Sequence, residues 1–179
     1  LVAMEYNVLL PAGDIPRLTE GYEGFFHLCD MKGDVEHAEL HYIVRDHDRA
    51  TFEARKKLME HAVKVINEKY GRSVVTLRLK DSYYNMAEKL TDHMELIENA
   101  KRACEAAGMK PFIEAVRGGT DGCVLTYHGL LCPNLPSAGH NAHGRFEYAP
   151  VESLKTGVRT VKQLLSPALI EAVILKKEK

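Results

Sequence analysis

The sequence lacks the features that mark several common classes of protein. No apolar run approaches the roughly 20 residues that a membrane-spanning helix needs, and we expect no signal peptide. Neither sign of charge dominates, because 24 Lys and Arg are interspersed with 25 Asp and Glu. The composition therefore argues against a membrane, and against nucleic acid, as the main partner.

Cysteine is also scarce, and its spacing does not suggest metal binding. The four cysteines are scattered and form no C-x-x-C pair (Cys29, Cys104, Cys123 and Cys132). This pattern favours reduced, mostly buried thiols in a cytoplasmic protein over a disulfide framework. The chain opens without methionine, on a stretch that resembles the middle of a helix, so we expect residue 1 to follow a cut in a longer protein.

The first half of the chain has the patterns of a small antiparallel sheet with helices on one face, an α+β arrangement. Apolar and polar residues alternate best over 38–46, and a long helix with one apolar face is followed by Gly71, which suits a helix end. The predicted elements are a helix over 1–10, strands over 24–31 and 38–46, a helix over 49–70 and a strand over 73–81.

A change of pattern within residues 82–89 marks a domain boundary, which we place between residues 88 and 89. Beyond it, helix and strand alternate, which implies an α/β architecture with parallel strands. The predicted elements are helices over 92–107 and 151–165, a strand over 112–116, a short helix after a glycine turn, and a helical tail beyond Pro167. Because the strands are too few for a sheet of their own, we interpret residues 89–179 as the last portion of a larger domain.

The stretch between residues 117 and 148 has the densest set of candidate functional residues. An apolar strand leads into RGGTDG and then a short helix, a layout that points free backbone N–H groups at an anion. Arg117 adds a cationic fork suited to a carboxylate, and a Pro-, Asn- and Gly-rich loop presents His143 as a candidate metal ligand. Glu147 is spaced to orient such a ligand. The glycines match neither the dinucleotide-binding nor the P-loop spacing.

Each candidate residue also has a simpler explanation when its spacing is considered alone. His143 is then an ordinary surface-loop histidine and Glu147 a solvent-facing charge. Arg117 is a strand-end arginine paired with an acid, and Arg45 belongs to a solvated ion-pair cluster with its charged neighbours. Asn85 is a turn residue and nothing more. Spacing alone favours these simpler explanations.

Seven motifs, in their order and at their separations, resemble the peptidase T family of tripeptide aminopeptidases, within the M20 group of di-zinc metallopeptidases. They are EGYEGFFHL, MKGDVEHAELHYIVRDHDR, FEARKK, DSYYNM, RGGTDG, GLLCPNL and HGRFEY. The resemblance covers residues 15–165. It is specific because several multi-residue motifs agree in both order and spacing.

The resemblance implies an α/β catalytic domain that holds two zinc ions and is interrupted in sequence by a lid domain. The lid is of the ferredoxin-like kind, with an antiparallel sheet and two helices, and matches residues 1–88. Residues 89–179 match the C-terminal portion of the catalytic domain. The resemblance places His143 on the last zinc ligand and Arg45 on the lid arginine that holds the substrate's terminal carboxylate. It places Asn85 and Arg117 on positions lining the same pocket.

Parts of the family's site have no counterpart in this sequence. The family takes most of its zinc ligands, its bridging aspartate and its general-base glutamate from another part of the catalytic domain. One histidine cannot hold two zinc ions, so we expect no catalytic residue in this chain, no activity from it alone, and weak or no zinc binding. His140 and Ala142 also stand beside Asn141 where the family usually has aromatic residues, which leaves the peptide preference open.

Two hypotheses from different classes follow. In the first, the chain is part of a cytoplasmic, zinc-dependent aminopeptidase that removes the N-terminal residue from tripeptides. In the second, it is a non-catalytic binding or dimerisation module whose lid domain forms a homodimer. The two are compatible, because lid domains of this family often mediate dimers. A small-molecule-sensing ferredoxin-like domain would fit residues 1–85 but would leave the motifs from RGGTDG to HGRFEY without a purpose, so it ranks last.

Overall fold

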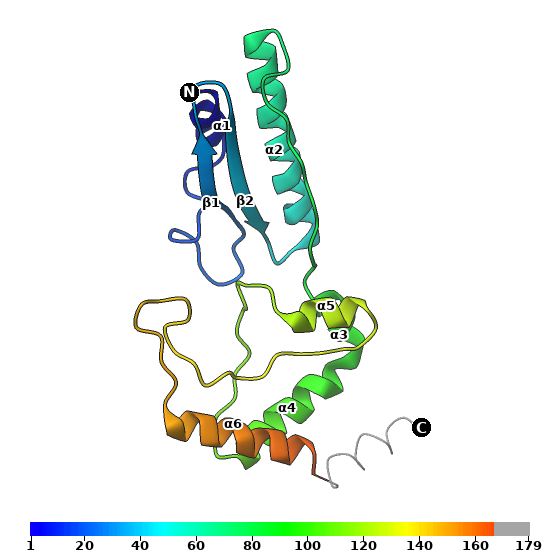
Figure 1. Ribbon diagram of the computed structural model, residues 1–179. Coiled ribbons are helices and arrows are strands. Elements are labelled where there is room, and N and C mark those ends of the chain that lie inside the picture. Colours follow the sequence, from blue (N-terminus) through cyan, green and yellow to red (C-terminus); the bar gives the residue numbers. More distant parts are fainter. Residues whose placement is uncertain (167–179) are drawn as a thin grey trace. The chain divides into compact units, whose positions relative to one another are not determined.

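The computed structural model describes residues 1–166, which form two compact units (Figure 1). The first unit contains Leu1–Asn85 together with Glu114–Gly119, and the second contains Met86–Ile113 and the described residues from 120 onward. The predicted boundary lay between residues 88 and 89, whereas the units divide after Asn85 and the segment 114–119 returns to the first unit. The helical tail predicted beyond Pro167 lies outside the described residues.

The first unit is built on an antiparallel hairpin of β1 (Phe25–Gly33) and β2 (Ala38–Arg45). The register runs from Phe25 opposite Arg45 to Gly33 opposite Ala38, with an irregularity between Leu28 and Asp30. The turn is closed by the Asp34 carboxylate, which accepts hydrogen bonds of 2.8 Å from two backbone N–H groups that follow it. The sequence-based prediction of two antiparallel strands here, and of a mixed α/β fold class, is confirmed.

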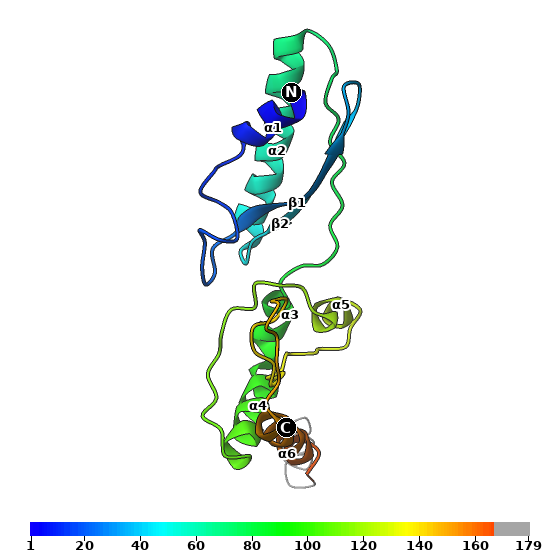
Figure 2. The same cartoon turned by 60° about the vertical axis from the view of Figure 1, so that its left-hand side comes forward.

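Two helices pack on one face of this hairpin, as Figure 2 shows: α1 (Val2–Leu9) and α2 (Arg49–Tyr70). Helix α2 begins where the Asp48 carboxylate accepts the Thr51 N–H at 2.9 Å, and it ends at Gly71 in the left-handed conformation. Its bounds agree with the prediction. The buried core of the unit combines residues of α1 and its C-cap, of β1 and of α2, and partly buried residues of β2 pack against it (Tyr6, Leu10, Phe26, Met59 and Ala62 in the core; Tyr42 and Val44 against it).

The third strand, predicted over residues 73–81, does not form. The apolar residues that suggested it, Val75 and Leu77, do pack half-buried against the core. The backbone, however, bonds to a side chain of α2. Asn67 Oδ1 accepts from Val74 N at 2.8 Å and from Val75 N at 2.9 Å, and its amide donates to the Val75 carbonyl at 2.9 Å. The alternating pattern therefore reflects the packing of apolar side chains against the core. The backbone groups of Val74 and Val75 bond to Asn67 and not to a neighbouring strand.

The second unit is helical in its described part. Its elements are α3 (Ala87–Leu90), the 3₁₀ turn η1 (Thr91–His93), α4 (Met94–Ala106), α5 (Asp121–Tyr127) and α6 (Val151–Leu164). Helix α6 crosses α4 through small side chains, with Ala103, Cys104 and Thr160 all buried. The predicted helices over 92–107 and 151–165 correspond to α4 and α6. Burial raises the pKa of the Cys104 thiol.

The strand predicted over residues 112–116 is absent, and with it the expected parallel sheet. Among the described residues of the second unit, the nearest approach to sheet structure is an isolated bridge between His140 and Tyr148. A strand requires a neighbour to accept and donate its backbone hydrogen bonds, and residues 86–166 provide none for this segment. Its apolar residues Phe112 and Ile113 remain exposed.

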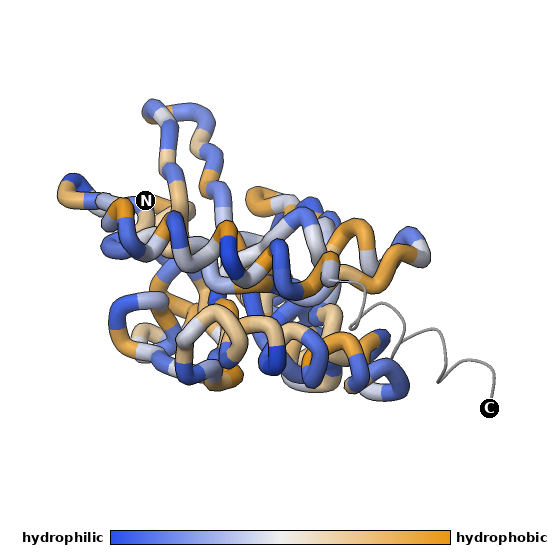
Figure 3. The backbone as a smooth tube through the Cα atoms, turned by 90° about the horizontal axis from the view of Figure 1, so that it is seen from below, coloured by the Kyte–Doolittle hydropathy of each residue, from blue (hydrophilic) through white to orange (hydrophobic). Residues whose placement is uncertain are grey.

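Amphipathic helices in this unit leave apolar surface open. Figure 3 shows apolar and polar residues alternating along the helical turns of the chain. Helix α6 and the residue after it expose large apolar side chains three or four positions apart (Val151, Leu154, Val158, Val161 and Leu165). This spacing places them on one stripe of the helix, whereas its small residues face α4.

Candidate functional site

The predicted carboxylate-binding residue Arg45 stands at the last position of β2 and is half-buried. One of its terminal nitrogens, Nη1, donates to the backbone carbonyl of Arg117 at 3.4 Å, and its guanidinium lies 5.6 Å from the centre of the Tyr83 ring. No acid within residues 1–166 forms an ion pair with it, so the simpler explanation, a solvated ion-pair cluster, does not describe Arg45. No carboxylate of the described residues therefore occupies the N–H donors of the Arg45 guanidinium.

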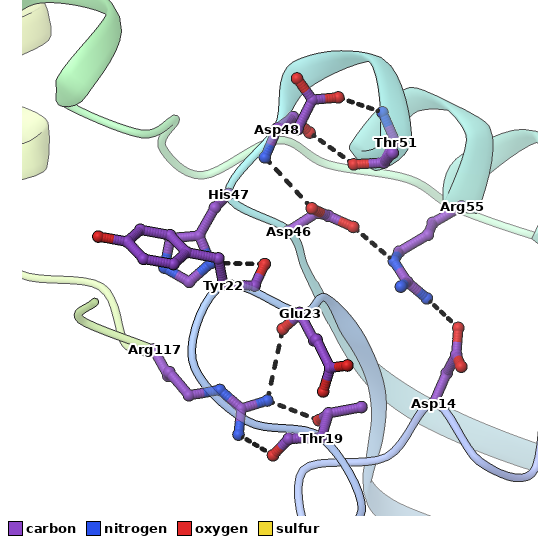
Figure 4. Close-up of polar contacts among 10 residues, drawn as sticks. All are labelled: Asp14, Thr19, Tyr22, Glu23, Asp46, His47, Asp48, Thr51, Arg55 and Arg117. Carbon is purple, nitrogen blue, oxygen red and sulfur yellow. Dashed lines mark hydrogen bonds and ion pairs between the residues drawn. The ribbon is translucent and has the colours of Figure 1, made fainter. Parts of the chain in front are cut away.

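The turn that follows Arg45 is fixed by an arginine between two acids (Figure 4). Arg55 Nη1 lies 2.6 Å from Asp14 and its Nε lies 2.8 Å from Asp46, whose side chain is only 7% exposed. Burial by itself would raise the pKa of Asp46, but hydrogen bonds from Arg55 and from neighbouring groups lower it below its usual value. Asp46 therefore stays ionised and holds the backbone of the turn through the Asp48 N–H at 3.2 Å.

Gly24 allows this turn to approach the start of β1. A Cβ added at Gly24 would collide with the Asp46 carboxylate and with the Arg45 backbone carbonyl. Gly24 is buried and directly precedes β1. The glycine in the motif EGYEGFFHL thus serves close packing of backbone against the end of β2.

His47 lies at the centre of this region, although no sequence pattern singles it out. Its Nδ1 is 3.2 Å from the Tyr22 carbonyl oxygen and its Nε2 is 3.3 Å from the Val116 carbonyl oxygen. Its ring also meets the Tyr22 ring edge-on, with the centroids 5.0 Å apart. The imidazole therefore contacts both the loop before β1, as Figure 4 shows for Tyr22, and the segment that returns to the unit at 114–119.

Asn85 and Arg117, the other two predicted pocket residues, also bond within this unit. The Asn85 amide donates to the His47 carbonyl at 3.0 Å, which is more than a turn residue would require. The Arg117 guanidinium donates to the Thr19 carbonyl, to Thr19 Oγ1 at 2.5 Å and to the Glu23 carbonyl at 3.4 Å. It also lies 5.1 Å from the centre of the Phe25 ring, so Arg117 holds the loop before β1 and is paired with no acid among residues 1–166.

His143, the predicted metal ligand, lies in the second unit. It is exposed, and its backbone is left-handed (φ 64°), as are those of Ala138 and Asn141 in the same loop. The loop is closed by the bridge between His140 and Tyr148, whose rings stack with centroids 5.0 Å apart. Glu147 accepts the backbone N–H of His143 at 3.2 Å, so in this structure its carboxylate orients the peptide and not the imidazole.

A two-zinc centre does not fit the residues that are described. Among residues 1–166, no group of three or more His, Cys, Asp or Glu side chains comes together in a way that could hold a metal ion. A zinc ion is usually bound by three or four such ligands, so His143 can supply only one position of a site. The role of His143 as a ligand stays a prediction.

The structure thus brings three of the four predicted site residues into one unit and describes the fourth with the other. Arg45, Asn85 and Arg117 meet around the backbone of His47 and Val116. Arg55 is the other residue that sequence reasoning missed. Its sequence signals were its place in the motif FEARKK and its position two turns along α2 from the Asp48 cap, on the side of the helix that faces the end of β2. No helix in the described part is long and apolar enough to span a bilayer.

Comparison with known proteins confirms the resemblance noted from the motifs. No protein-family model matches the chain. The chain is 44% identical over 165 residues to a protein named peptidase T from Fusobacterium nucleatum and 46% identical over 165 residues to one from Halothermothrix orenii. It is 45% identical over 163 residues to one from Bacillus subtilis. These matches cover 91–92% of the chain but 40% of each relative, so the chain spans about two fifths of their length.

Proposed function

We propose that this chain is a segment of a zinc-dependent aminopeptidase of the peptidase T type, cytoplasmic, which removes the N-terminal residue from tripeptides. The similarity to three proteins of that name supports the peptidase class. In this proposal the first unit is the lid domain, and the second unit is the C-terminal portion of the catalytic domain. The first unit supplies the groups that bind the free carboxylate of the peptide, and His143 supplies one zinc ligand.

The observation that carries the proposal is the state of Arg45. Its guanidinium is half-buried, has no carboxylate partner among the described residues, and touches one carbonyl oxygen at 3.4 Å. A planar guanidinium in this state can form two parallel hydrogen bonds to an incoming carboxylate, and it stays charged at any physiological pH. An enzyme that acts on short unblocked peptides needs such a group to recognise the free C-terminus.

Arg45 and Arg117 do not both offer their guanidinium groups to the same carboxylate. Arg117 uses its terminal nitrogens on Thr19 and Glu23, and its Nε is buried without a hydrogen-bond partner. Its backbone carbonyl, by contrast, faces Arg45. We therefore assign the carboxylate to Arg45, while Arg117 orients the segment that lies beside it.

The zinc ions would polarise the scissile carbonyl and activate water when bound, and the ligands that hold them must come largely from outside this chain. We accordingly expect no peptidase activity from the 179-residue chain alone, with or without added zinc. Hydrolysis by the isolated chain would contradict this part of the proposal. The measurement is release of the N-terminal residue from an unblocked tripeptide.

A chimera tests the carboxylate assignment. The segment of Bacillus subtilis peptidase T that matches this chain is replaced by the chain, and hydrolysis of a tripeptide is compared with that of its C-terminal amide. Arg45→Ala should raise KM for the free acid roughly 10- to 100-fold, as expected for loss of charge-assisted hydrogen bonds. It should barely change KM for the amide. Arg78→Ala, at an exposed arginine of the same unit, is the control. Equal losses for the acid and the amide would refute the assignment.

The module hypothesis has one observation in its favour. Within the described residues, β1 pairs only with β2, which leaves an open backbone edge on each strand. Sedimentation velocity of the chain alone tests self-association through this sheet. A monomer at tens of micromolar would remove the homodimer from the proposal without affecting the carboxylate site.

A further inference from the structure

His47 makes contacts that a neutral imidazole cannot satisfy. Both ring nitrogens face backbone carbonyl oxygens, at 3.2 Å for Tyr22 and 3.3 Å for Val116. A carbonyl oxygen only accepts hydrogen bonds, and a neutral imidazole has a single N–H to donate. One of the two contacts would then set a nitrogen lone pair against an oxygen lone pair. Only the imidazolium, which carries an N–H on each nitrogen, donates to both.

The two carbonyls belong to segments that are far apart in the sequence. Tyr22 lies in the loop 19–24 before β1, and Val116 lies in the segment 114–119. The contacts of His47 span 25 and 69 residues respectively. Arg117, the residue after Val116, reaches the same loop through Thr19 and Glu23. Two side chains thus connect the loop 19–24 with the segment 114–119. One is Arg117, which is always charged, and the other is His47, whose charge depends on its protonation.

The position of His47 couples this contact to Arg45. His47 follows Arg45 by two residues, and the Val116 carbonyl that it contacts directly precedes Arg117. The carbonyl of Arg117 in turn lies 3.4 Å from Arg45 Nη1. The backbone of His47 itself is held by the Asn85 amide at 3.0 Å. A change at the imidazole therefore acts on the segment that faces the guanidinium.

Several of the other charges in this region have partners of their own. The ionisable groups on the segments that meet at His47 are Glu20, Tyr22, Glu23, Arg45, Asp46, Asp48, Arg49, Asp81, Tyr83, Tyr84, Glu114 and Arg117. Asp46 is bound by Arg55, the Asp48 carboxylate caps α2, and the Glu23 carboxylate accepts the Glu20 N–H at 2.8 Å. Among the described residues, no acid forms an ion pair with His47, so its hydrogen bonds run to backbone carbonyls alone.

We propose that His47 is a positioning residue that, as an imidazolium, holds the segment 114–119 against the loop 19–24 and so keeps the Arg117 carbonyl in place beside Arg45. Loss of the proton removes one of the two hydrogen bonds and loosens the segment. The contact is complete only in the imidazolium form and keeps a single hydrogen bond in the neutral form, so it weakens as the pH rises. The consequence for peptide binding rests on the proposed function of Arg45, whereas the contact itself does not.

Hydrogen exchange on the 179-residue chain without peptide tests the contact. Amides of segments 19–24 and 114–119 are compared at about pH 5.5 and about pH 8.5, each corrected for the intrinsic exchange rate. Wild type should be roughly three- to tenfold better protected at the acidic pH, as expected for one hydrogen bond. His47→Gln, which retains a single donating group, should lose this difference. His41→Gln, at an exposed histidine of β2, should keep it.

Equal protection of wild type at both pH values would overturn the proposal, and so would a pH difference that survives in His47→Gln. If His47→Gln fails to fold, nitrogen chemical shifts of labelled histidine in wild type decide the question. Both ring N–H groups of His47 should be observed, slowly exchanging, in the acidic form. A single neutral tautomer down to about pH 5.5 would refute the imidazolium contact.

The functional consequence is tested separately in the chimera with Bacillus subtilis peptidase T. His47→Gln should raise KM for the free tripeptide about threefold or more at acidic pH, with kcat little changed and no effect at alkaline pH. A KM unaffected at acidic pH would overturn the link to the carboxylate site. If Arg45→Ala also left KM unchanged, the proposed function would fail, while the exchange result for His47 would stand on its own.

Discussion

The end of β2 in the first unit and the His143 loop in the second unit are built in opposite ways. At the end of β2, buried ion pairs and side-chain to backbone hydrogen bonds join segments up to 98 residues apart in sequence. The His143 loop is exposed and closes on itself, through the bridge from His140 to Tyr148 and the contact from Glu147 to the backbone of His143. It also carries three non-glycine residues in the left-handed conformation.

This difference separates a proposed carboxylate site whose contacts lie within one unit from a proposed zinc position that would supply a single ligand. Arg45 is positioned by contacts that the first unit contains in full, so its geometry does not require another chain. His143 stands in a strained backbone and belongs to no group of three or more metal-binding side chains among the described residues. Strain of this kind often marks functional positions. Four substitutions test whether the first region is rigid and the second merely strained.

The largest effect is expected from Arg55→Ala in the first unit. It removes the cationic partner of both Asp46 and Asp14 and leaves the 7% exposed Asp46 carboxylate without a countercharge. We expect a loss of about 3 kcal/mol in the free energy of unfolding, measured by urea denaturation. Lys64→Ala, which breaks an exposed ion pair with Glu68 on the same helix, should cost less than about 0.5 kcal/mol. Similar values for both variants would show that the frame around Asp46 is not rigid.

Gly24→Ala tests the close approach at the start of β1. Its Cβ would collide with the Asp46 carboxylate and the Arg45 carbonyl, so backbone has to move. We expect a loss of about 2 kcal/mol, within the range for overpacked sites. Gly13→Ala, where an added Cβ meets no atom within 4 Å, is the matched control and should change stability little. If Gly24→Ala were also neutral, the packing of β1 on the Asp46 turn would be looser than described.

The pH dependence of stability should report Asp46. Its pKa is lowered in the folded state, so its contribution is present above the unfolded pKa of about 3.9 and is lost as the pH falls through the folded pKa. Asp46→Asn should therefore cost about 1.5 kcal/mol near pH 7, and this difference should shrink below about pH 4. Urea denaturation of both proteins between about pH 7 and about pH 3 measures it. A difference that stays constant with pH would mean that the Asp46 charge is not responsible.

The smallest effect is expected in the second unit, where the substitution should raise the free energy of unfolding and not lower it. His143→Gly places glycine at a φ of 64° and should raise stability by about 0.5–1 kcal/mol, because glycine adopts this conformation without strain. Ala138→Gly, at a φ of 62° in the same loop, should behave alike. Scanning calorimetry of the second unit's transition measures both. A clear loss of stability in His143→Gly alone would indicate that the imidazole makes packing contacts.

The motifs predicted which candidate residues lie close together in the first unit, but not the contacts that they make; their roles as site residues stay predictions. Arg45, Asn85 and Arg117 were selected from motifs, and they do meet in one unit. The engagement of Arg117 with Thr19 and the two contacts of His47 had no sequence signal, because each joins residues between 25 and 98 positions apart. Neither partner in such a pair restricts the other's local pattern, so inspection of either segment alone cannot reveal it.

The sequence by itself determined the elements that local interactions define. Helix α2 runs between an Asp48 cap and a left-handed Gly71, and the β1–β2 hairpin follows from alternation and a turn, all within a few residues of one another. Only the tertiary structure decided that Val74 and Val75 bond to Asn67, that residues 73–81 form no strand, and that 112–116 form none without a neighbour. The reason is that strand hydrogen bonds need a partner supplied from elsewhere in the chain, whereas a helix closes its own.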